Sequence, residues 1–127
     1  MKRILTILAA IVCLCGCEKS FTPTSVTLSA DGETVTVHTS IQPESLDIMN
    51  YDGEGIQSPK YDEETETYTI TNDWLTASIS KSTYDSSTNQ YELVLTAVKN
   101  TTGQRRTLYV GGMDKNYADS MKVTQEK

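Results

Sequence analysis

The sequence predicts an all-β fold, an antiparallel β-sandwich of about seven to eight short strands. The chain contains several short runs in which apolar and polar residues alternate, the pattern of a strand with one buried face. Turn-forming residues separate these runs. Beyond the first 16 residues no run shows the apolar period of a helix. These three observations together favour two packed antiparallel sheets.

The first strands are expected early in this region. Apolar residues alternate with polar ones over 26–30 and again over 34–38, and Asp31-Gly32 supplies a turn between the two runs. This pattern predicts a β-hairpin with one buried face. A weaker strand is expected over 46–48, and a long acidic loop follows it.

The later strands alternate more clearly. Strands are expected over 67–71 and 74–79. The run 91–98 is apolar on both faces, which is typical of a central strand. The remaining elements are a strand over 106–110, a loop around Gly111-Gly112 and Asp114, and a last strand over 121–125.

The first 16 residues have the anatomy of a cleaved signal peptide. Lys2 and Arg3 form a basic head, and an apolar run follows over 4–14. A helix of that length rises about 16 Å, roughly half of a bilayer core. The run is therefore too short to span a membrane.

The end of this segment, Leu14-Cys15-Gly16-Cys17, resembles the bacterial lipobox. The resemblance implies cleavage between Gly16 and Cys17 and acylation of Cys17, so that N-terminal lipid attaches the protein to a membrane. The expected place is the cell envelope, at the periplasmic or cell-surface face of the outer membrane. The alternative is an ordinary secretory signal with a chance cysteine. The expected organisation is a signal peptide (1–16), a polar tether (17–24) and one β-sandwich domain (25–127).

Composition limits the chemistry of this domain. All three cysteines lie within 13–17, which leaves the domain without a disulfide, a cysteine nucleophile or a cysteine metal ligand. Loss of Lys2 and Arg3 with the signal leaves nine basic residues against 17 acidic ones, a net charge of −8. This charge argues against a nucleic acid partner. The acidic region 44–66 fits either a solvated face or a divalent-cation site.

Three groups of motifs, in this order, resemble a known family. They are Leu28-Ser29-Ala30-Asp31-Gly32 leading into Val35-Thr36-Val37, then Asp73-Trp74-Leu75-Thr76, then Leu93-Val94-Leu95 with 100–106 and Val123-Thr124-Gln125. Together they look like the BACON domain, the Bacteroidetes-associated carbohydrate-binding domain often found N-terminal to enzymes, over about residues 25–126. The resemblance implies an immunoglobulin-like sandwich on an exported Bacteroidetes protein, with a carbohydrate or mucin ligand or a spacer role.

Catalysis is not expected, and no cofactor or metal site is predicted. Ser-His chemistry needs a positioned imidazole. The one histidine, His38, follows Val37 on a strand, and its parity points it to solvent. A single histidine without cysteine cannot build the usual zinc set. Acidic residues are so numerous that no particular pair indicates a glycosidase.

Sugar recognition needs exposed aromatic rings with polar neighbours. The candidate ligand-binding residues are Trp74, Tyr84, Tyr117 and Tyr61. A tryptophan at a strand start is more often a core anchor, and a loop tyrosine can simply cap the end of a sandwich. Separately, Asp119-Ser120-Met121 resembles the O-glycosylation site of Bacteroidetes proteins, which makes Ser120 a candidate for glycosylation.

Two functions remain open from the sequence. The first is a non-catalytic, lipid-anchored module that binds a polysaccharide, a mucin glycan or a protein at the bacterial envelope. The second is a structural or interaction subunit, or a spacer, that binds no sugar and docks to another envelope protein.

Overall fold

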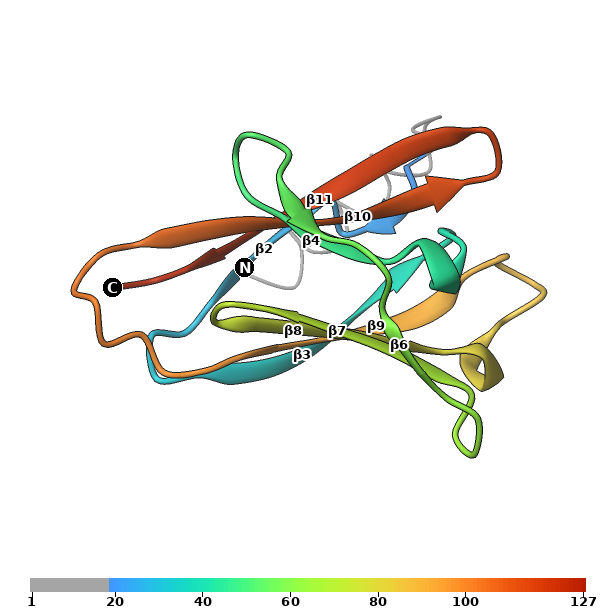
Figure 1. Cartoon of the computed structure of the whole chain (residues 1–127), viewed down its shortest axis with the longest axis horizontal. Helices are drawn as coiled ribbons and strands as arrows, with labels where there is room; N and C mark the ends of the chain where they lie inside the picture. The colour runs from blue at the N-terminus through green and yellow to red at the C-terminus, as the bar shows by residue number, and fades with distance from the viewer. Residues whose placement is uncertain (1–18) are drawn as a thin grey trace, which may run out of the picture.

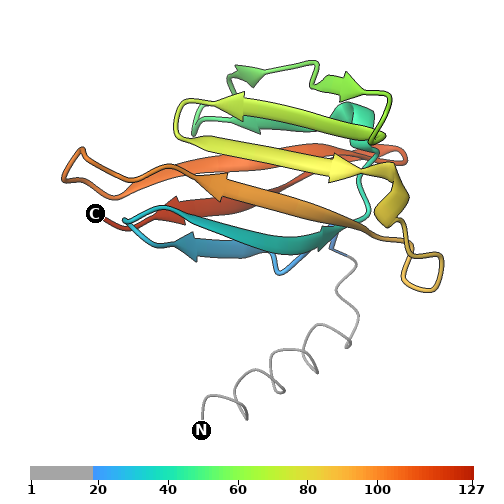
Figure 2. The same ribbon diagram turned by 90° about the horizontal axis from the view of Figure 1, so that it is seen from below.

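A computed structural model of the chain describes residues 19–127, which form two packed β-sheets. Figure 1 shows the sheets edge-on as two layers, and Figure 2 shows the strands of one sheet side by side. Sheet A has the order β1 (Phe21–Thr22), β3 (Glu33–Thr39), β9 (Tyr91–Ala97), β8 (Leu75–Ser80), β7 (Thr67–Asn72) and β6 (Lys60–Asp62). Sheet B has the order β2 (Ser25–Leu28), β11 (Tyr117–Gln125), β10 (Arg106–Asp114), β4 (Asp47–Met49) and β5 (Gly55–Ile56). Two short 3-10 helices, η1 (Pro43–Ser45) and η2 (Lys81–Thr83), join strands.

The arrangement confirms an all-β, immunoglobulin-like sandwich. The order β3-β9-β8 in sheet A and β11-β10-β4 in sheet B match the B-E-D and G-F-C strands of that fold. Paired strands are antiparallel, apart from β2, which runs parallel to β11. The strand predicted to be central, β9, does lie between β3 and β8.

The core lies between the sheets and is built from alternate residues of each long strand. In β9, Leu93 and Leu95 are fully buried, whereas Glu92, Val94 and Thr96 face outward. Trp74 precedes β8 and is 4% exposed. The other core residues of the long strands are Leu28, Val37, Ile48, Ile70, Leu75, Ala77, Ile79, Ala97, Leu108, Val110, Met121 and Val123.

The predicted hairpin over 26–38 is wrong. A turn does form, with the Gly32 N–H donating to the Ser29 carbonyl at 3.2 Å, but the flanking strands belong to different sheets. β2 pairs with β11, and β3 pairs with β1 and β9. Leu28 and Val37 both face the core. Because alternation shows only that one face is buried, it cannot tell a hairpin from a turn that joins two facing sheets.

The loop expected around Gly111-Gly112 and Asp114 is also wrong, since β10 continues to Asp114 and the turn comes after it. The two glycines permit close packing within the strand. A Cβ at Gly111 would lie 2.6 Å from Met49 Cε, and one at Gly112 would lie 2.6 Å from Ile41 Cδ1. These glycines make room for neighbouring side chains.

The described residues form eleven strands, more than the seven to eight expected. The additional strands are short: β1 and β5 have two residues each, and β6 has three. A two-residue strand has no readable period. Two of these strands, β5 and β6, lie within the segment expected to be an acidic loop.

Residues 20–22, which were expected to lie in the tether, pack into the sandwich. Ser20 is fully buried and Phe21 is 1% exposed. The Ser20 carbonyl accepts hydrogen bonds from the Ser40 N–H at 2.9 Å and from Thr39 Oγ1 at 2.8 Å. A polar segment with one phenylalanine has no strand signal of its own, so only the tertiary contacts reveal β1.

A buried amide fastens the end of the sandwich that carries the C-terminus. Gln125 is fully buried, and its Nε2 donates to the carbonyls of Ser29 and Val98 at 2.9 and 2.7 Å. Its Oε1 accepts from Arg106 Nε at 2.8 Å, and the Arg106 guanidinium lies 5.0 Å from the centroid of the Trp74 ring. This chain of contacts joins β11 to both sheets.

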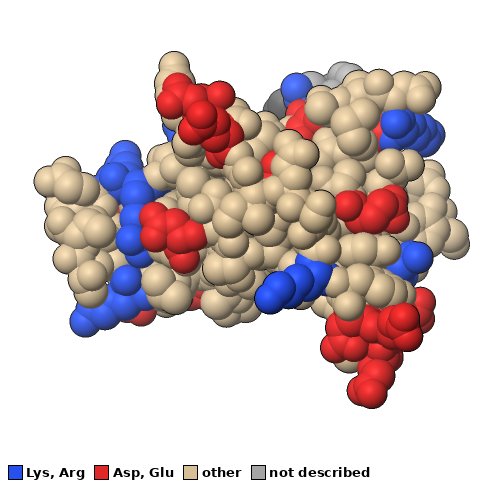
Figure 3. Space-filling model, viewed as in Figure 1, with Lys and Arg blue, Asp and Glu red and all other residues tan. Residues whose placement is uncertain are grey.

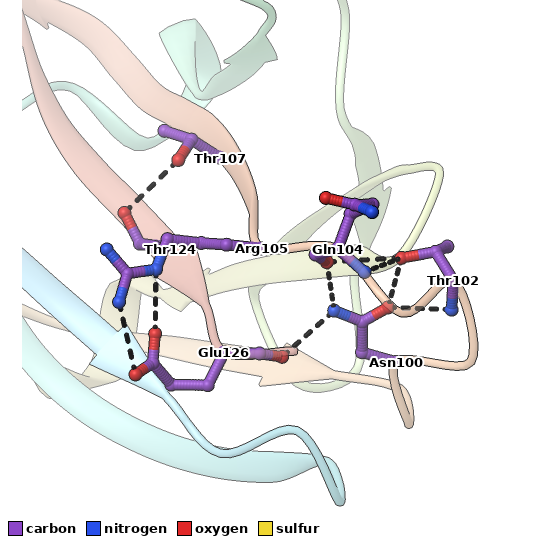
Figure 4. Close-up of polar contacts among 7 residues, drawn as sticks. All are labelled: Asn100, Thr102, Gln104, Arg105, Thr107, Thr124 and Glu126. Carbon is purple, nitrogen blue, oxygen red and sulfur yellow. Dashed lines mark hydrogen bonds and ion pairs between the residues drawn. The ribbon is translucent and has the colours of Figure 1, made fainter.

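A second amide closes the loop after β9 (Figure 4). Asn100 Nδ2 donates to the carbonyls of Gln104 and Glu126 at 2.7 and 2.9 Å, and its Oδ1 accepts from the N–H and hydroxyl of Thr102 at 3.0 and 2.7 Å. Arg105 and Glu126 form an ion pair at 2.9 Å beside it. This end of the sandwich has its polar groups engaged in holding the fold.

Within residues 19–127, no helix has the length and apolar character needed to cross a bilayer.

The early start of the domain makes a direct prediction. Phe21→Ala removes a buried ring and leaves a cavity, and it should lower the free energy of unfolding by about 3 kcal/mol. Thr24→Ala, at an exposed position of the same segment, should change it by less than about 0.5 kcal/mol. Urea unfolding followed by tryptophan fluorescence measures both. Equal stability of the two variants would show that residues 20–22 are a tether after all.

Candidate ligand-binding groove

A groove of about 550 Å³ lies at the end of the sandwich opposite the C-terminus, where the β10–β11 turn meets the segment after η2. We call it the tyrosine groove. Its volume is within the range of small-ligand sites. The residues on which its chemistry depends are Lys19, Tyr84, Asn89, Asp114, Lys115 and Tyr117.

The ring of Tyr84 lies on one side of the groove, and two contacts hold it in position. It is 46% exposed, and its hydroxyl donates to Asn89 Oδ1 at 2.8 Å. Its ring packs against Tyr91 with centroids 4.9 Å apart at 51°. Burial, and to a lesser degree the neighbouring Tyr84, raises the pKa of Tyr91. The hydrogen bond and the ring contact keep the Tyr84 ring ordered.

The loop that carries Asn89 is fixed by the carboxylate of Asp85. Its Oδ1 accepts from the hydroxyl and the N–H of Ser87 at 2.6 and 2.9 Å. These hydrogen bonds, that of the hydroxyl first, lower the pKa of Asp85. Asn89 itself has a φ of 58°, a left-handed conformation that asparagine tolerates. The loop therefore presents Asn89 beside Tyr84 in a defined position.

Tyr117 lies on the other side of the groove and is held by Asp114. Asp114 Oδ2 accepts from the hydroxyls of Ser20 at 2.9 Å, Ser40 at 2.5 Å and Tyr117 at 3.3 Å. Asp114 is 8% exposed and Tyr117 is 47% exposed. One buried carboxylate thus accepts hydrogen bonds from three hydroxyl groups and orients the exposed Tyr117 ring beside the groove.

The groove combines aromatic faces with hydrogen-bonding groups. Its charged lining residues are Lys19, Lys115 and Asp114, and the remainder are tyrosines and uncharged polar side chains. Such a surface can stack on the C–H face of a sugar ring while amides and ammonium groups bond its hydroxyls. The single carboxylate already accepts three hydrogen bonds.

The candidate ligand residues separate into two groups in the structure. Tyr84 and Tyr117 meet in one groove. Tyr61 lies elsewhere, on β6 at the far edge of sheet A, 43% exposed and packed against Tyr68 with centroids 4.5 Å apart. Trp74 is in the core beneath Arg106 and has no face free for stacking.

The other predicted positions lie outside the groove. His38 is exposed as its parity indicated, and it lines a smaller hollow of about 270 Å³ with Asp85 and Glu92. Ser120 is exposed on β11. Gly16 and Cys17 lie outside the described residues. Among residues 19–127, no three His, Cys, Asp or Glu side chains come together in a way that could hold a metal ion.

The acidic residues of 62–66 form a projecting tip and not a pocket. They belong to the turn between β6 and β7, and all but Thr65 carry carboxylates. Figure 3 shows red side chains gathered on this protrusion, while basic side chains gather at the end that carries the C-terminus. The tip is solvated on several sides.

Sequence reasoning missed Asp114, Lys19 and Lys115. Asp114 was expected in a loop, and its partners Ser20 and Ser40 lie more than 70 residues away. No local pattern marks such a cluster. The hairpin turns at Lys115, which has a φ of 56°.

Comparison with known proteins finds similarity in fold. No family model matches the chain, and no curated protein matches it. A protein from Bacteroides thetaiotaomicron, solved by NMR, is 16% identical over 81% of this chain and 75% of its own, with a TM-score of 0.52. A GH5 xyloglucanase from Bacteroides ovatus, in complex with a XXXG heptasaccharide, is 14% identical over 81% of this chain, with a TM-score of 0.47, and this chain spans 17% of that enzyme. Both neighbours are Bacteroides proteins. The likeness to the B. thetaiotaomicron protein, at 16% identity, shows a shared fold.

The Asp114 cluster makes a prediction for stability. Asp114→Ala removes the acceptor of three hydroxyl groups and should lower the free energy of unfolding by about 2 kcal/mol. The ring signals of Tyr117 should shift as well. Asp52→Ala, an exposed acid on a turn, is the control and should change stability by less than about 0.5 kcal/mol. Chemical denaturation and NMR of the two variants measure these effects. A stable Asp114→Ala variant with unmoved Tyr117 signals would contradict the role of this carboxylate.

Proposed function

We propose that this protein is a non-catalytic binding module of the bacterial envelope that holds a glycan in the tyrosine groove. One observation carries the proposal: two exposed tyrosines 33 positions apart, Tyr84 and Tyr117, flank one polar groove, and each is oriented by a hydrogen bond. Carbohydrate sites need aromatic faces that are already in place, because a flexible ring loses entropy when it stacks.

The composition of the groove favours binding over hydrolysis. Glycoside hydrolysis uses two carboxyl groups at a set separation, one of them often desolvated. The tyrosine groove contributes Asp114 alone, and its Oδ2 is already occupied by Ser20, Ser40 and Tyr117. A carboxylate that orients hydroxyl groups in this way supports a ligand site without acting on the ligand.

Membership of the BACON family and a lipid anchor at Cys17 belong to the same proposal. The sandwich fold and its Bacteroides neighbours are in keeping with that family. Lys19 lines the groove and lies two residues after Cys17. Two residues span at most about 7 Å. Lipid on Cys17 would therefore hold the tyrosine groove close to the outer membrane, at the periplasmic or cell-surface face.

A second function, docking to another envelope protein without a sugar ligand, is favoured by a different observation. The acidic tip over 62–66 projects from the body of the domain beside the edge strand β6 (Figure 3). A projecting charged tip and an open strand edge are common features of protein-binding surfaces. The two functions use different parts of the molecule and can be tested separately.

The glycan proposal predicts a specific loss of binding. Calorimetry against plant polysaccharides, mucin and their oligosaccharides should identify at least one ligand. Tyr84→Ala and Tyr117→Ala should each weaken its affinity by about fivefold, because each removes one stacking ring. Tyr51→Ala, at an 82% exposed tyrosine outside the groove, should leave the affinity unchanged.

Two results would reject this glycan site. One is the absence of binding to every polysaccharide tested. The other is an equal loss of affinity in the Tyr51→Ala control, which would place recognition elsewhere. Circular dichroism of each variant shows whether the sandwich is retained, so a folding defect is not mistaken for a lost contact.

The anchor proposal predicts lipid incorporation at one residue. The protein expressed in a Bacteroides host should incorporate labelled palmitate, and Cys17→Ser should abolish the label and release the protein from membrane fractions. Cys15→Ser is the matched control and should keep the label. Label that survives Cys17→Ser would overturn the lipobox interpretation. Protease treatment of whole cells then distinguishes the cell-surface face from the periplasmic face.

A further inference from the structure

A second groove, of about 330 Å³, lies on the outer face of sheet B. We call it the methionine groove. The residues that define it are Asp47, Met49, Gln57, Ser58, Met113 and Ala118. It is separate from the tyrosine groove and does not depend on the proposed glycan site.

Strand alternation explains why this face is hollowed. Ile48 points into the core, so Asp47 and Met49 on either side of it point outward. Asp47 pairs across the strands with Gly111, which has no side chain to cover it. A Cβ at Gly55 would lie 2.9 Å from Asp47 Oδ2 and 2.9 Å from Met49 Cγ. Two glycines on neighbouring strands thus leave room for the carboxylate and the thioether.

Asp47 is unusual among the acidic residues because it is buried at this surface. It is 8% exposed, and its Oδ1 accepts from the Ile48 N–H at 2.8 Å. Within residues 19–127, its Oδ2 has no hydrogen-bond donor and no cationic side chain pairs with it. Desolvation raises the pKa of this carboxyl. A buried carboxylate of this kind is costly unless a cation pairs with it.

The lining of the groove supplies no such cation. The charged residues that line it are Asp47 and Asp119, both acidic. The oxygens of Asp119 accept from the N–H groups of Ser20 and Ser120 at 3.1 and 2.9 Å. Of the two carboxylates that line the groove, Asp47 is therefore the one with an oxygen, Oδ2, that accepts no hydrogen bond within residues 19–127.

We propose that the methionine groove binds a lysine or arginine side chain of a partner protein, with the cationic head on Asp47 Oδ2 and the aliphatic stem against Met49 and Met113. Thioethers adapt to such stems, and a carboxylate strengthens its hydrogen bonds to a cation. The groove adjoins β5, an edge strand of sheet B, because Gln57 and Ser58 follow that strand directly and line the groove. An open strand edge beside the pocket gives backbone contacts to a polypeptide, which a free amine could not use.

The methionine methyl groups report on this site directly. In protein with ¹³C-labelled methionine methyls, n-butylammonium should shift the Met49 and Met113 signals with a Kd of about 1–10 mM. Met121 is fully buried in the core and should stay unmoved. Neutral n-butanol at the same concentrations should give shifts at least about fivefold weaker, because it lacks the charge.

Two substitutions test the role of Asp47. Asp47→Asn should weaken butylammonium binding at least about tenfold without lowering the unfolding midpoint at pH 7, since it removes a desolvated charge. Glu64→Gln removes the same charge from the exposed acidic tip and should have no effect on binding. Gln57→Lys places an ammonium at the rim and should block the probe while Asp47 is intact. Binding that is insensitive to both Asp47→Asn and Gln57→Lys would overturn the site.

The protein nature of the occupant has its own test. A random peptide library selected on the full domain, with counter-selection on the Gln57→Lys variant, should be enriched in peptides with a lysine or arginine next to apolar residues. Replacing that basic residue by norleucine should abolish binding. A selection without basic enrichment would reject a protein partner, whatever the butylammonium result, and neither outcome bears on the tyrosine groove.

Discussion

The buried carboxylate of Asp114 is the interaction on which the site depends. It draws Ser20 and Ser40 from the β1–β3 edge of sheet A to Tyr117 at the β10–β11 turn of sheet B. The apolar contacts between two sheets are not directional. Such contacts alone therefore leave the ends of the sheets free to shift relative to each other. A carboxylate bonded by three hydroxyl groups is directional. It fixes how the turn lies against the start of the domain, and the tyrosine groove lies beside this contact.

The sequence predicted strands where the pattern of apolar residues could be read. Alternation over six or seven residues identified β3, β7 and β8, because such a strand repeats its period, and β9 was identified by its long apolar run. It failed for β1, β5 and β6, which are two or three residues long and are held by pairing with longer neighbours. The hairpin error has another cause. The pattern of buried residues says which side of a strand is covered, but not which sheet covers it.

The sequence predicted a site residue only where the type of that residue and its polar neighbours were informative by themselves. Tyr84 and Tyr117 stood out because aromatic rings in polar segments are seldom core residues. The sequence could not tell whether Trp74 binds a ligand or belongs to the core. In the structure it is a core residue, buried beneath Arg106. Asp114 and Asp47 could not be found in this way. The sequence has 17 acidic residues. An acidic residue differs from the others by its burial and by its partners from distant strands, and both are properties of the packing.

The two grooves are two faces of one hairpin. Alternation along β10 and β11 sends Asp114 and Tyr117 to the tyrosine groove and sends their neighbours, Met113 and Ala118, to the methionine groove. The same turn therefore supports both sites, and the Ser20 segment that braces it follows closely on Cys17. If lipid holds that segment at the membrane, neither groove can move far from the bilayer. A glycan or a protein that reaches them must approach along the membrane surface, which favours partners that are themselves bound to the envelope.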